Sequence, residues 1–207
     1  MESVTKRFKD HYESTFSKFG ASSKGVDWGK DEDVVLRYEN MLSVIREDVS
    51  SNVSILDVGC GYGGLLEFAR KQGVSMHYTG IDVAENMVSY ARNHFTECEF
   101  LIGDVLHYDF DQHFDYVVCN GILTQKLAAT NREMDEFANA LILKMFELCN
   151  SGIAYNIMSN KVNFMVENLY YRSPIEMLEF CLNNISTKVR IDHAYPIYEY
   201  TVYAYRD

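Results

Sequence analysis

The sequence predicts an α/β fold in which helices cover both faces of a mostly parallel sheet. Between residues 55 and 157, short apolar segments alternate with segments of helical periodicity. The first apolar segment leads into a glycine-rich turn that opens a helix, as in nucleotide-binding units. Two segments rich in aromatic and β-branched residues close the chain, and this composition favours strands. Strands that alternate with helices are typical of a doubly wound sheet.

Length and composition restrict the domain count and the class of partner. The 207 residues suit one α/β domain with a modest addition, and 47% hydrophobic residues suffice for a core. The net charge of −11, without a dense block of Lys or Arg, argues against nucleic acid as a partner. The five cysteines are scattered and predict reduced thiols. No apolar run has the length of a signal peptide or a membrane span, so we expect a cytoplasmic protein without a membrane partner.

Residues 1–50 predict a helical cap or lid that belongs to the same domain as the core formed by residues 51–207. Four aromatic residues recur at helical spacing near the N-terminus: Phe8, Tyr12, Phe16 and Phe19. A turn-rich loop over residues 20–29 follows, and it carries Trp28. We expect a second helix from Asp31 to about Glu47, with acidic residues in its first turn.

The glycine-rich turn at residues 59–64 predicts a nucleotide-type cofactor site. Its glycines let the backbone approach a ligand where a Cβ would collide, and the following helix directs its first amides toward that turn. The glycine spacing also satisfies the dinucleotide pattern G-x-G-x-x-G. Asp57, at the end of the preceding strand, separates the two candidates. It would repel a pyrophosphate, whereas it favours the ammonium and sulfonium groups of S-adenosylmethionine.

Three further strands end in polar residues at the same edge of the predicted sheet. The strand 77–81 ends in Asp82, which is placed to accept hydrogen bonds from ribose hydroxyls. The strand 99–102 leads to Asp104, a candidate acceptor for the adenine amino group. The strand 114–119 leads to Asn120, a candidate residue for the pocket. A helix over residues 84–92 sets Met87 near the adenosine.

The remaining elements complete the alternation. Helical periodicity indicates a helix over residues 132–149, and a fifth strand follows at 153–157. Ser173 and Pro174 form an N-cap and first-turn pair for a helix that runs to about Asn183. Strands are expected at residues 186–193 and 198–205, the segments noted above as closing the chain.

The order of these motifs resembles the class I S-adenosylmethionine-dependent methyltransferases. The matching segments are LDVGCGYG (56–63), GIDVAENMVSYAR (80–92), GDV (103–105) and FDYVVCNGIL (114–123). The resemblance implies a seven-stranded, mostly parallel sheet that ends in an antiparallel pair, with the cofactor across the carboxyl ends of the first strands. It implies S-adenosylmethionine as cofactor and S-adenosylhomocysteine as product. The residues we expect at the cofactor are Trp28, Arg37, Asp57, Gly59, Cys60, Gly61, Asp82, Val83, Met87, Asp104, Val105 and Asn120.

Methyl transfer from a sulfonium needs little catalytic machinery, because the methyl group is already activated. The protein has to align a nucleophile and exclude water, and it needs a base only if the acceptor loses a proton. The segment after the fourth strand, Asn-Gly-Ile-Leu, lacks the Pro-Pro-aromatic sequence that similar enzymes use for planar nitrogen acceptors. We therefore expect an oxygen acceptor. The catalytic candidates are Tyr12, His107 and Asn120, and His11 and His193 are more remote ones.

Other residues are candidates for binding. Arg37, on the second helix, is expected to clamp the carboxylate of the cofactor's methionine part. The residues expected to hold a polar or anionic acceptor are Tyr12, Tyr170, Tyr171 and Arg172. The segment 107–113 is rich in potential metal ligands, but we interpret it as a solvated loop and assign no metal.

The sequence thus predicts a methyltransferase that acts on a small polar metabolite, such as a saccharide or a secondary-metabolite intermediate. We expect it to be a monomer or a homodimer. Two alternatives stay open at this point. One is an NAD-dependent oxidoreductase of similar topology, and the other is an accessory protein that binds the cofactor without catalysis.

Overall fold

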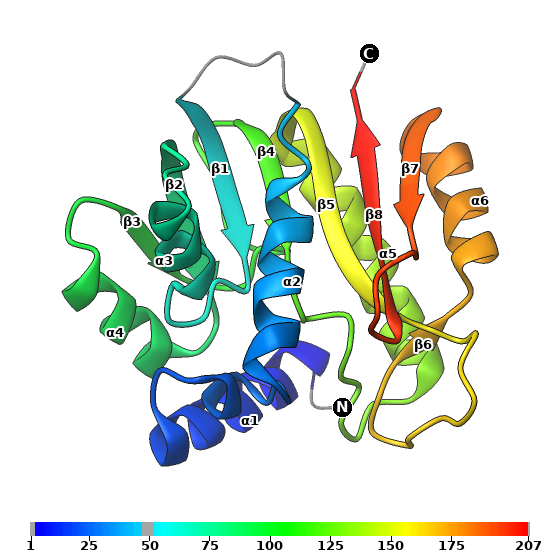
Figure 1. Cartoon of the computed structure of the whole chain (residues 1–207), viewed down its shortest axis with the longest axis horizontal. Coiled ribbons are helices and arrows are strands. Elements are labelled where there is room, and N and C mark those ends of the chain that lie inside the picture. Colours follow the sequence, from blue (N-terminus) through cyan, green and yellow to red (C-terminus); the bar gives the residue numbers. More distant parts are fainter. Residues whose placement is uncertain (1–2, 47–51, 207) are drawn as a thin grey trace.

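The computed structural model describes residues 3–46 and 52–206. Helices and strands alternate along most of the chain (Figure 1). The helices are α1 (Val4–Phe19), η1 (Ser23–Val26, a 3-10 helix), α2 (Asp31–Leu42), α3 (Gly64–Lys71), α4 (Glu85–His94), α5 (Asn131–Leu148) and α6 (Pro174–Asn184). The strands are β1 (Val53–Val58), β2 (Met76–Asp82), β3 (Glu99–Ile102), β4 (Phe114–Cys119), β5 (Cys149–Ser159), β6 (Tyr171–Arg172), β7 (Lys188–Asp192) and β8 (Glu199–Tyr205).

Seven strands form one continuous sheet in the order β3-β2-β1-β4-β5-β8-β7. Strands β1 to β5 run parallel to one another, whereas β8 is antiparallel to β5 and β7 is antiparallel to β8. This arrangement confirms the predicted mostly parallel sheet with an antiparallel C-terminal pair. The two-residue β6 pairs with β5 off this path, and the sequence did not predict it.

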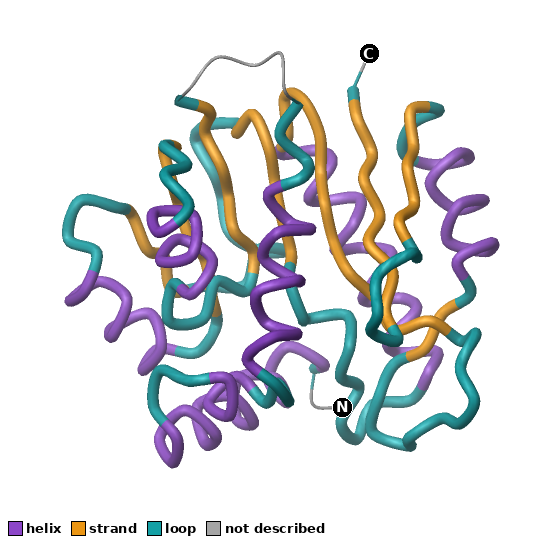
Figure 2. Tube along the Cα trace, viewed as in Figure 1, coloured by secondary structure: helices purple, strands orange, loops and turns teal. Residues whose placement is uncertain are grey.

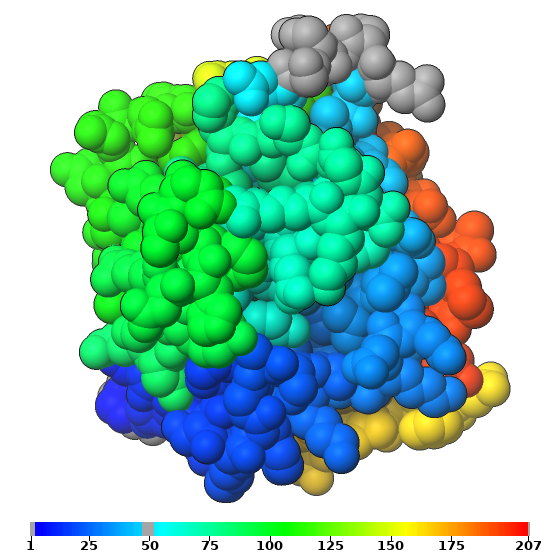
Figure 3. All heavy atoms as spheres, turned by 60° about the vertical axis from the view of Figure 1, so that its left-hand side comes forward, coloured from blue at the N-terminus to red at the C-terminus, as the bar shows by residue number. Residues whose placement is uncertain are grey.

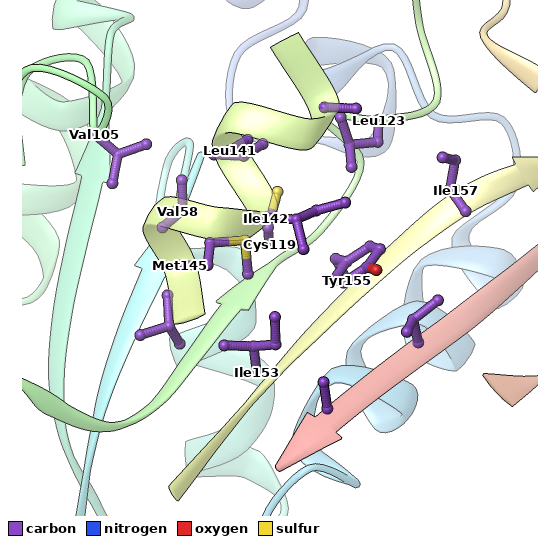
Figure 4. Close-up of a cluster of buried hydrophobic side chains, with 14 of the residues drawn as sticks. Val58, Val105, Cys119, Leu123, Leu141, Ile142, Met145, Ile153, Tyr155 and Ile157 are labelled. Carbon is purple, nitrogen blue, oxygen red and sulfur yellow. The ribbon is translucent and has the colours of Figure 1, made fainter. Parts of the chain in front are cut away.

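Helices cover both faces of the sheet (Figures 1 and 2). On one face, α5 and α6 pack against β1, β4, β5 and β8, and on the other face α2, α3 and α4 pack against the strands. The largest cluster of buried hydrophobic side chains lies between α5 and the sheet (Figure 4). Its residues include Val58, Cys119, Leu141, Met145, Ile153 and Tyr155, each at most 2% exposed.

Helix α1 lies across the carboxyl ends of the parallel strands, where it packs beside α4 (Figures 1 and 3). Its buried residues, Phe8 and Phe16, lie on the aromatic face that the sequence predicted. The turn-rich loop after it contains η1, which the sequence prediction left as irregular structure.

Helix α2 ends earlier than expected. Leu42 is its last residue, and Ser43 is its C-cap. The chain then turns. The side chain of Val44 is fully buried in the core cluster that it shares with residues of α2, α3 and β1. The predicted helix end at Glu47 and the boundary between residues 50 and 51 lie outside the described residues. None of the helices in the described ranges is both long and apolar enough to cross a membrane.

Candidate cofactor and acceptor site

A cleft opens at the carboxyl ends of β1 to β4, beneath α1. Its lining encloses about 940 Å³ of empty space when the open solvent at its mouth is included. Its lining includes every residue that the sequence predicted at the cofactor except Arg37: Trp28, Asp57, Gly59, Cys60, Gly61, Asp82, Val83, Met87, Asp104, Val105 and Asn120. Parallel strands bring these residues together because their carboxyl ends share one edge of the sheet.

The turn after β1 is shaped for close packing. Gly59 has φ of +74°, and its amide donates to the carbonyl of Ile81 at the end of β2. The positive φ favours glycine, and a Cβ at this position would lie 2.5 Å from Cδ1 of Ile122, whose side chain would have to move. The turn therefore brings the end of β1 close to the segment after β4.

Asp57 is a buried carboxyl group in the wall of the cleft. The residue is only 2% exposed, and the hydroxyl of Tyr78 donates a hydrogen bond to its Oδ2 over 2.6 Å. Burial raises the pKa of Asp57 to about 7, although the hydrogen bond from Tyr78 acts in the opposite direction. A cationic ligand would favour the ionised form of this group, and an anionic ligand would oppose it.

Asp82 is fixed by backbone amides on either side of the cleft. Its Oδ2 accepts from the amide of Gly61 over 2.8 Å, and its Oδ1 accepts from the amide of Ala84 over 2.8 Å. Burial nonetheless raises the pKa of this carboxyl group above its ordinary value. A carboxylate oxygen can accept more than one hydrogen bond, so Asp82 can also accept one from a ligand hydroxyl.

Asp104 joins the end of β3 to α1. Its Oδ2 accepts from the hydroxyl of Thr5 over 3.0 Å and lies 3.2 Å from Nδ1 of His107, while its Oδ1 accepts from the amide of Leu106. Thr5 also lines the cleft. The predicted adenine acceptor therefore already holds the N-terminal helix in place.

Asn120 carries the clearest sign that the cleft is built for a ligand. The residue is 8% exposed, and neither its Oδ1 nor its Nδ2 has a hydrogen-bond partner among the described residues. An unpaired buried amide costs free energy unless a ligand or water satisfies it. A cleft with this orphaned amide, three carboxyl groups and a glycine turn fits a cationic nucleoside such as S-adenosylmethionine.

Tyr12 and Trp28 bring the N-terminal cap to the same cleft. Burial, with the negative charge of Asp27, raises the pKa of the Tyr12 hydroxyl well above its ordinary value. Tyr12 therefore stays protonated at neutral pH and acts as a hydrogen-bond donor rather than as a base.

The structure does not bring the other candidates to the cleft. The side chain of His107 is 82% exposed and does not line it. Arg37 instead forms a bidentate ion pair with Glu199. Tyr170 is buried and donates to Asp135, whereas Arg172 donates to Asn139.

Tyr171 also lies away from the cleft, and its hydroxyl accepts from the amide of Val166. Tyr170, Tyr171 and Arg172 thus have structural partners, because α6 and the short strand β6 draw their segment toward α5 and β5, whereas Tyr12, the fourth expected acceptor residue, lines the cleft. Within the described ranges, no group of three or more His, Cys, Asp or Glu side chains is arranged to hold a metal ion.

Sequence reasoning missed a polar cluster beside the cleft. Oδ2 of Asp27 lies 3.1 Å from Nε2 of His11 and accepts from Nε2 of Gln125 over 3.2 Å. Asp27 stands between two cleft-lining residues and has φ of +56°, which is uncommon for a residue with a side chain. Asp27 and Gln125 are 98 positions apart, and neither belongs to a motif, so no local signal would have paired them.

Comparisons with known proteins agree with this geometry. A family model described as a methyltransferase domain matches residues 49–200. A protein of Mycobacterium tuberculosis that is named as a methyltransferase is 30% identical over 154 residues, which are 72% of this chain and 90% of that protein. Malonyl-acyl-carrier protein O-methyltransferase of Acetivibrio thermocellus is 35% identical over 82 residues, 39% of this chain and 29% of that enzyme.

The relatives include N-methyltransferases as well as O-methyltransferases. Among solved structures, magnesium protoporphyrin IX methyltransferase from Synechocystis, with bound S-adenosylmethionine, matches 100% of this chain and 99% of its own. Its TM-score is 0.69 and its identity is 16%, so this likeness concerns the fold.

Proposed function

Because the chain belongs to the family of S-adenosylmethionine-dependent methyltransferases, we propose that it methylates an oxygen atom of a small polar metabolite. Family membership sets aside the NAD-dependent oxidoreductase and the accessory protein that binds without catalysis. The observation that carries a polar acceptor is the buried, unpaired amide of Asn120 in the cleft. A hydroxyl or an uncharged amino group can satisfy the two halves of that amide, and the absence of the Pro-Pro-aromatic sequence after β4 then favours oxygen.

Three carboxyl groups at the ends of neighbouring strands are proposed to hold the cofactor. When bound, S-adenosylmethionine supplies an activated methyl group on a positively charged sulfur. Asp57 offers its carboxylate to a cationic group, Asp82 accepts from ribose hydroxyls, and Asp104 accepts from the adenine amino group. The cap residues 1–50 and the core 51–207 act as one domain in this proposal, because both line the cleft.

We place the methyl acceptor where three segments meet: α1, Asp27 at the end of η1, and the turn after β4. Tyr12 donates from its hydroxyl. His11 and Asp27 do not line the cleft themselves, but they adjoin in the chain the lining residues Tyr12, Val26 and Trp28, and this pair takes up the proton that the acceptor hydroxyl loses. Asp27 holds the imidazole through Nε2 and supports its positive charge, as carboxylates do for basic histidines. This assignment replaces His107, whose side chain projects into solvent.

Helix α1 is proposed to exclude water from the transfer. Phe8 packs against Phe137 of α5 with ring centroids 5.8 Å apart, and Phe16 stacks on Tyr62 beside the glycine turn at 6.2 Å. These contacts seat the helix over the cleft. A dry site strengthens the interaction of fixed dipoles with the reacting charges.

Calorimetry and an acceptor panel test the proposal in two steps. S-adenosylmethionine and S-adenosylhomocysteine should both bind, and the absence of binding at millimolar concentration would contradict the cofactor assignment. The panel pairs each hydroxyl compound with its amine analogue, and release of S-adenosylhomocysteine is measured. We expect turnover of the hydroxyl members. Turnover of amines alone would exclude the oxygen acceptor but leave methyl transfer intact.

The proton acceptor is tested on the same turnover. Turnover of a hydroxyl compound needs an intact proton acceptor, so His11→Gln should lower the rate strongly and Asp27→Asn should lower it less. The exposed His113 offers a control, and His113→Gln should leave the rate unchanged. A loss of rate in His107→Gln, with no loss in His11→Gln, would favour His107 as the proton acceptor.

A further inference from the structure

The turn after β4 carries Asn120, Gly121 and Ile122 into the cleft, and both local and distant hydrogen bonds hold it. The carbonyl of Gly121 accepts locally, from the amide of Thr124 over 3.2 Å and from the Thr124 hydroxyl over 2.6 Å. The amide of Gly121 donates to Oδ1 of Asn156, a residue of β5, over 2.7 Å. Asn156 is 1% exposed, and this hydrogen bond is buried. The position of the turn therefore depends on how Asn156 is oriented.

Asn156 is in turn fixed by an ion pair. Its Nδ2 donates to Oε2 of Glu199 on β8 over 2.6 Å. Glu199 accepts from Nε of Arg37 over 3.1 Å at each carboxylate oxygen, and Nη2 of Arg37 also donates to it. The side chains of Arg37 and Glu199 are 13% and 2% exposed. The orientation of the Asn156 amide is thus dictated, because only its Nδ2 can face the carboxylate and only its Oδ1 can face the amide of Gly121.

A second route joins the same cation to the same turn. The guanidinium of Arg37 lies over the indole of Trp28, with Cζ 5.0 Å from the ring centroid. Trp28 packs against Gly121, where φ is +90° and a Cβ would lie 2.8 Å from Cζ2 of the indole. Both routes from Arg37 therefore converge on Gly121.

A buried ion pair is a poor means of gaining stability alone. Removing two charges from water costs several kcal/mol per ion, and apolar residues of similar volume often stabilise a core equally well. Such a pair makes sense where it fixes one orientation among several. The pair here fixes α2, β5 and β8 to a turn that lines the cofactor cleft.

We propose that Arg37, Glu199 and Asn156 form a positioning relay that holds the turn 120–122 in place for cofactor binding and methyl transfer. The relay residues are positioning residues, since none of the three lines the cleft. The inference rests on the proposed function in that the turn faces the transferred group. It assigns Arg37 a role different from the expected clamp on the cofactor carboxylate.

A charge-swap cycle tests the relay. Glu199→Gln removes the carboxylate, and Asn156→Asp places a second carboxylate beside it. The double variant Asn156→Asp/Glu199→Gln restores the net charge and a complementary donor–acceptor pair with its direction reversed, because the new glutamine donates to the new aspartate. We expect each single change to weaken S-adenosylhomocysteine binding about tenfold, and the double variant to recover most of that loss.

The chain offers a matched control on the same two elements. Tyr203, on β8, donates from its hydroxyl to the carbonyl of Asn40 on α2 over 2.9 Å. Tyr203→Phe therefore removes a hydrogen bond between α2 and β8 without touching the relay. It should lower the melting temperature but leave S-adenosylhomocysteine affinity within twofold of wild type. An equal loss of affinity in Tyr203→Phe, or no recovery in the double variant, would overturn the proposal.

Two measurements on the ligand-free protein keep the relay separate from the proposed function. Amide hydrogen exchange at Gly121 should accelerate in both single variants, slow again in the double variant and stay at the wild-type rate in Tyr203→Phe. The emission of Trp28, the chain's one tryptophan, should shift in the same pattern. If wild type fails to bind S-adenosylhomocysteine, the proposed function fails while exchange still decides the relay. Unchanged exchange in Glu199→Gln, or in Asn156→Asp if the first variant does not fold, overturns the relay whatever the protein binds.

Discussion

Asp57 has opposite electrostatic preferences in the free and the ligand-bound protein. In the free protein, burial favours its neutral form and raises its pKa to about 7. A bound cation favours the ionised form, so binding should become stronger as the pH rises through this value. The same shift makes the free protein lose stability as the pH rises from the unfolded-state value near 4 toward 7, because the folded state binds the extra proton.

We therefore expect S-adenosylmethionine affinity to increase about tenfold between pH 6 and pH 8, the change in ionised fraction for a pKa of about 7. Asp57→Asn should bind more weakly and show no such dependence. Titration calorimetry at several pH values measures both. A pH-independent affinity in wild type would show that the carboxylate does not respond to the cofactor's charge.

Gly59 and Gly73 allow backbone conformation and crowding to be separated. Both have φ of +74°, but a Cβ at Gly59 would collide with Ile122, whereas a Cβ at Gly73 would meet nothing within 4 Å. Gly73→Ala should cost about 1 kcal/mol of unfolding free energy from conformation alone. Gly59→Ala should cost about 1–3 kcal/mol more, from overpacking, and should abolish ligand binding. Urea unfolding measures the difference, and equal costs would refute the crowding.

At the scale of elements, short polar signals mark where α5 and α6 begin. Thr130 and Glu133 form a capping box at the start of α5: the amide of Glu133 donates to Oγ1 of Thr130, and the amide of Thr130 donates to a carboxylate oxygen of Glu133. Ser173 caps α6 in the predicted manner, with Pro174 as the first helical residue. Helix ends are harder to predict, since tertiary packing of Val44 rather than a local signal accompanies the end of α2.

Thr130→Ala should lower the unfolding free energy by about 1 kcal/mol, because it leaves an amide of the first turn of α5 without its partner. Thr130→Ser retains the hydroxyl and should lose much less. S-adenosylhomocysteine affinity should be unchanged in both, since Thr130 does not line the cleft. Equal destabilisation by serine and alanine, measured by urea unfolding, would indicate that the methyl group rather than the cap matters.

At the scale of the whole molecule, net charge restricts the substrate. A chain with 30 acidic and 19 basic residues repels phosphate backbones unless its cations gather on one face. Arg37 and several other arginines already contact carboxylates, backbone carbonyls or aromatic rings. The acidic balance therefore supports a metabolite acceptor rather than a nucleic acid.

We expect no binding of labelled RNA or duplex DNA at low ionic strength, where electrostatic attraction is strongest. Fluorescence anisotropy at micromolar protein measures this directly. A basic protein serves as a positive control for non-specific attraction. Salt-sensitive binding of RNA by the chain would contradict a small-molecule acceptor.

The order of strands and helices could be predicted from the sequence because periodicity and composition are local properties. Asp57, Asp82 and Asp104 each follow an apolar segment, and parallel pairing then places them at one edge of the sheet. The cofactor cleft was predictable for the same reason. The strand β6 was not, because two residues carry no periodic pattern.

The sequence by itself determined the fold class, the family and the side of the sheet where the cofactor cleft lies. Only the tertiary structure decided the partners of individual polar residues. Arg37 meets Glu199 across 162 positions, Asp27 meets Gln125 across 98, and His107 faces solvent although its segment is rich in polar residues. Such pairings depend on which elements become neighbours in space, and local spacing contains no record of that.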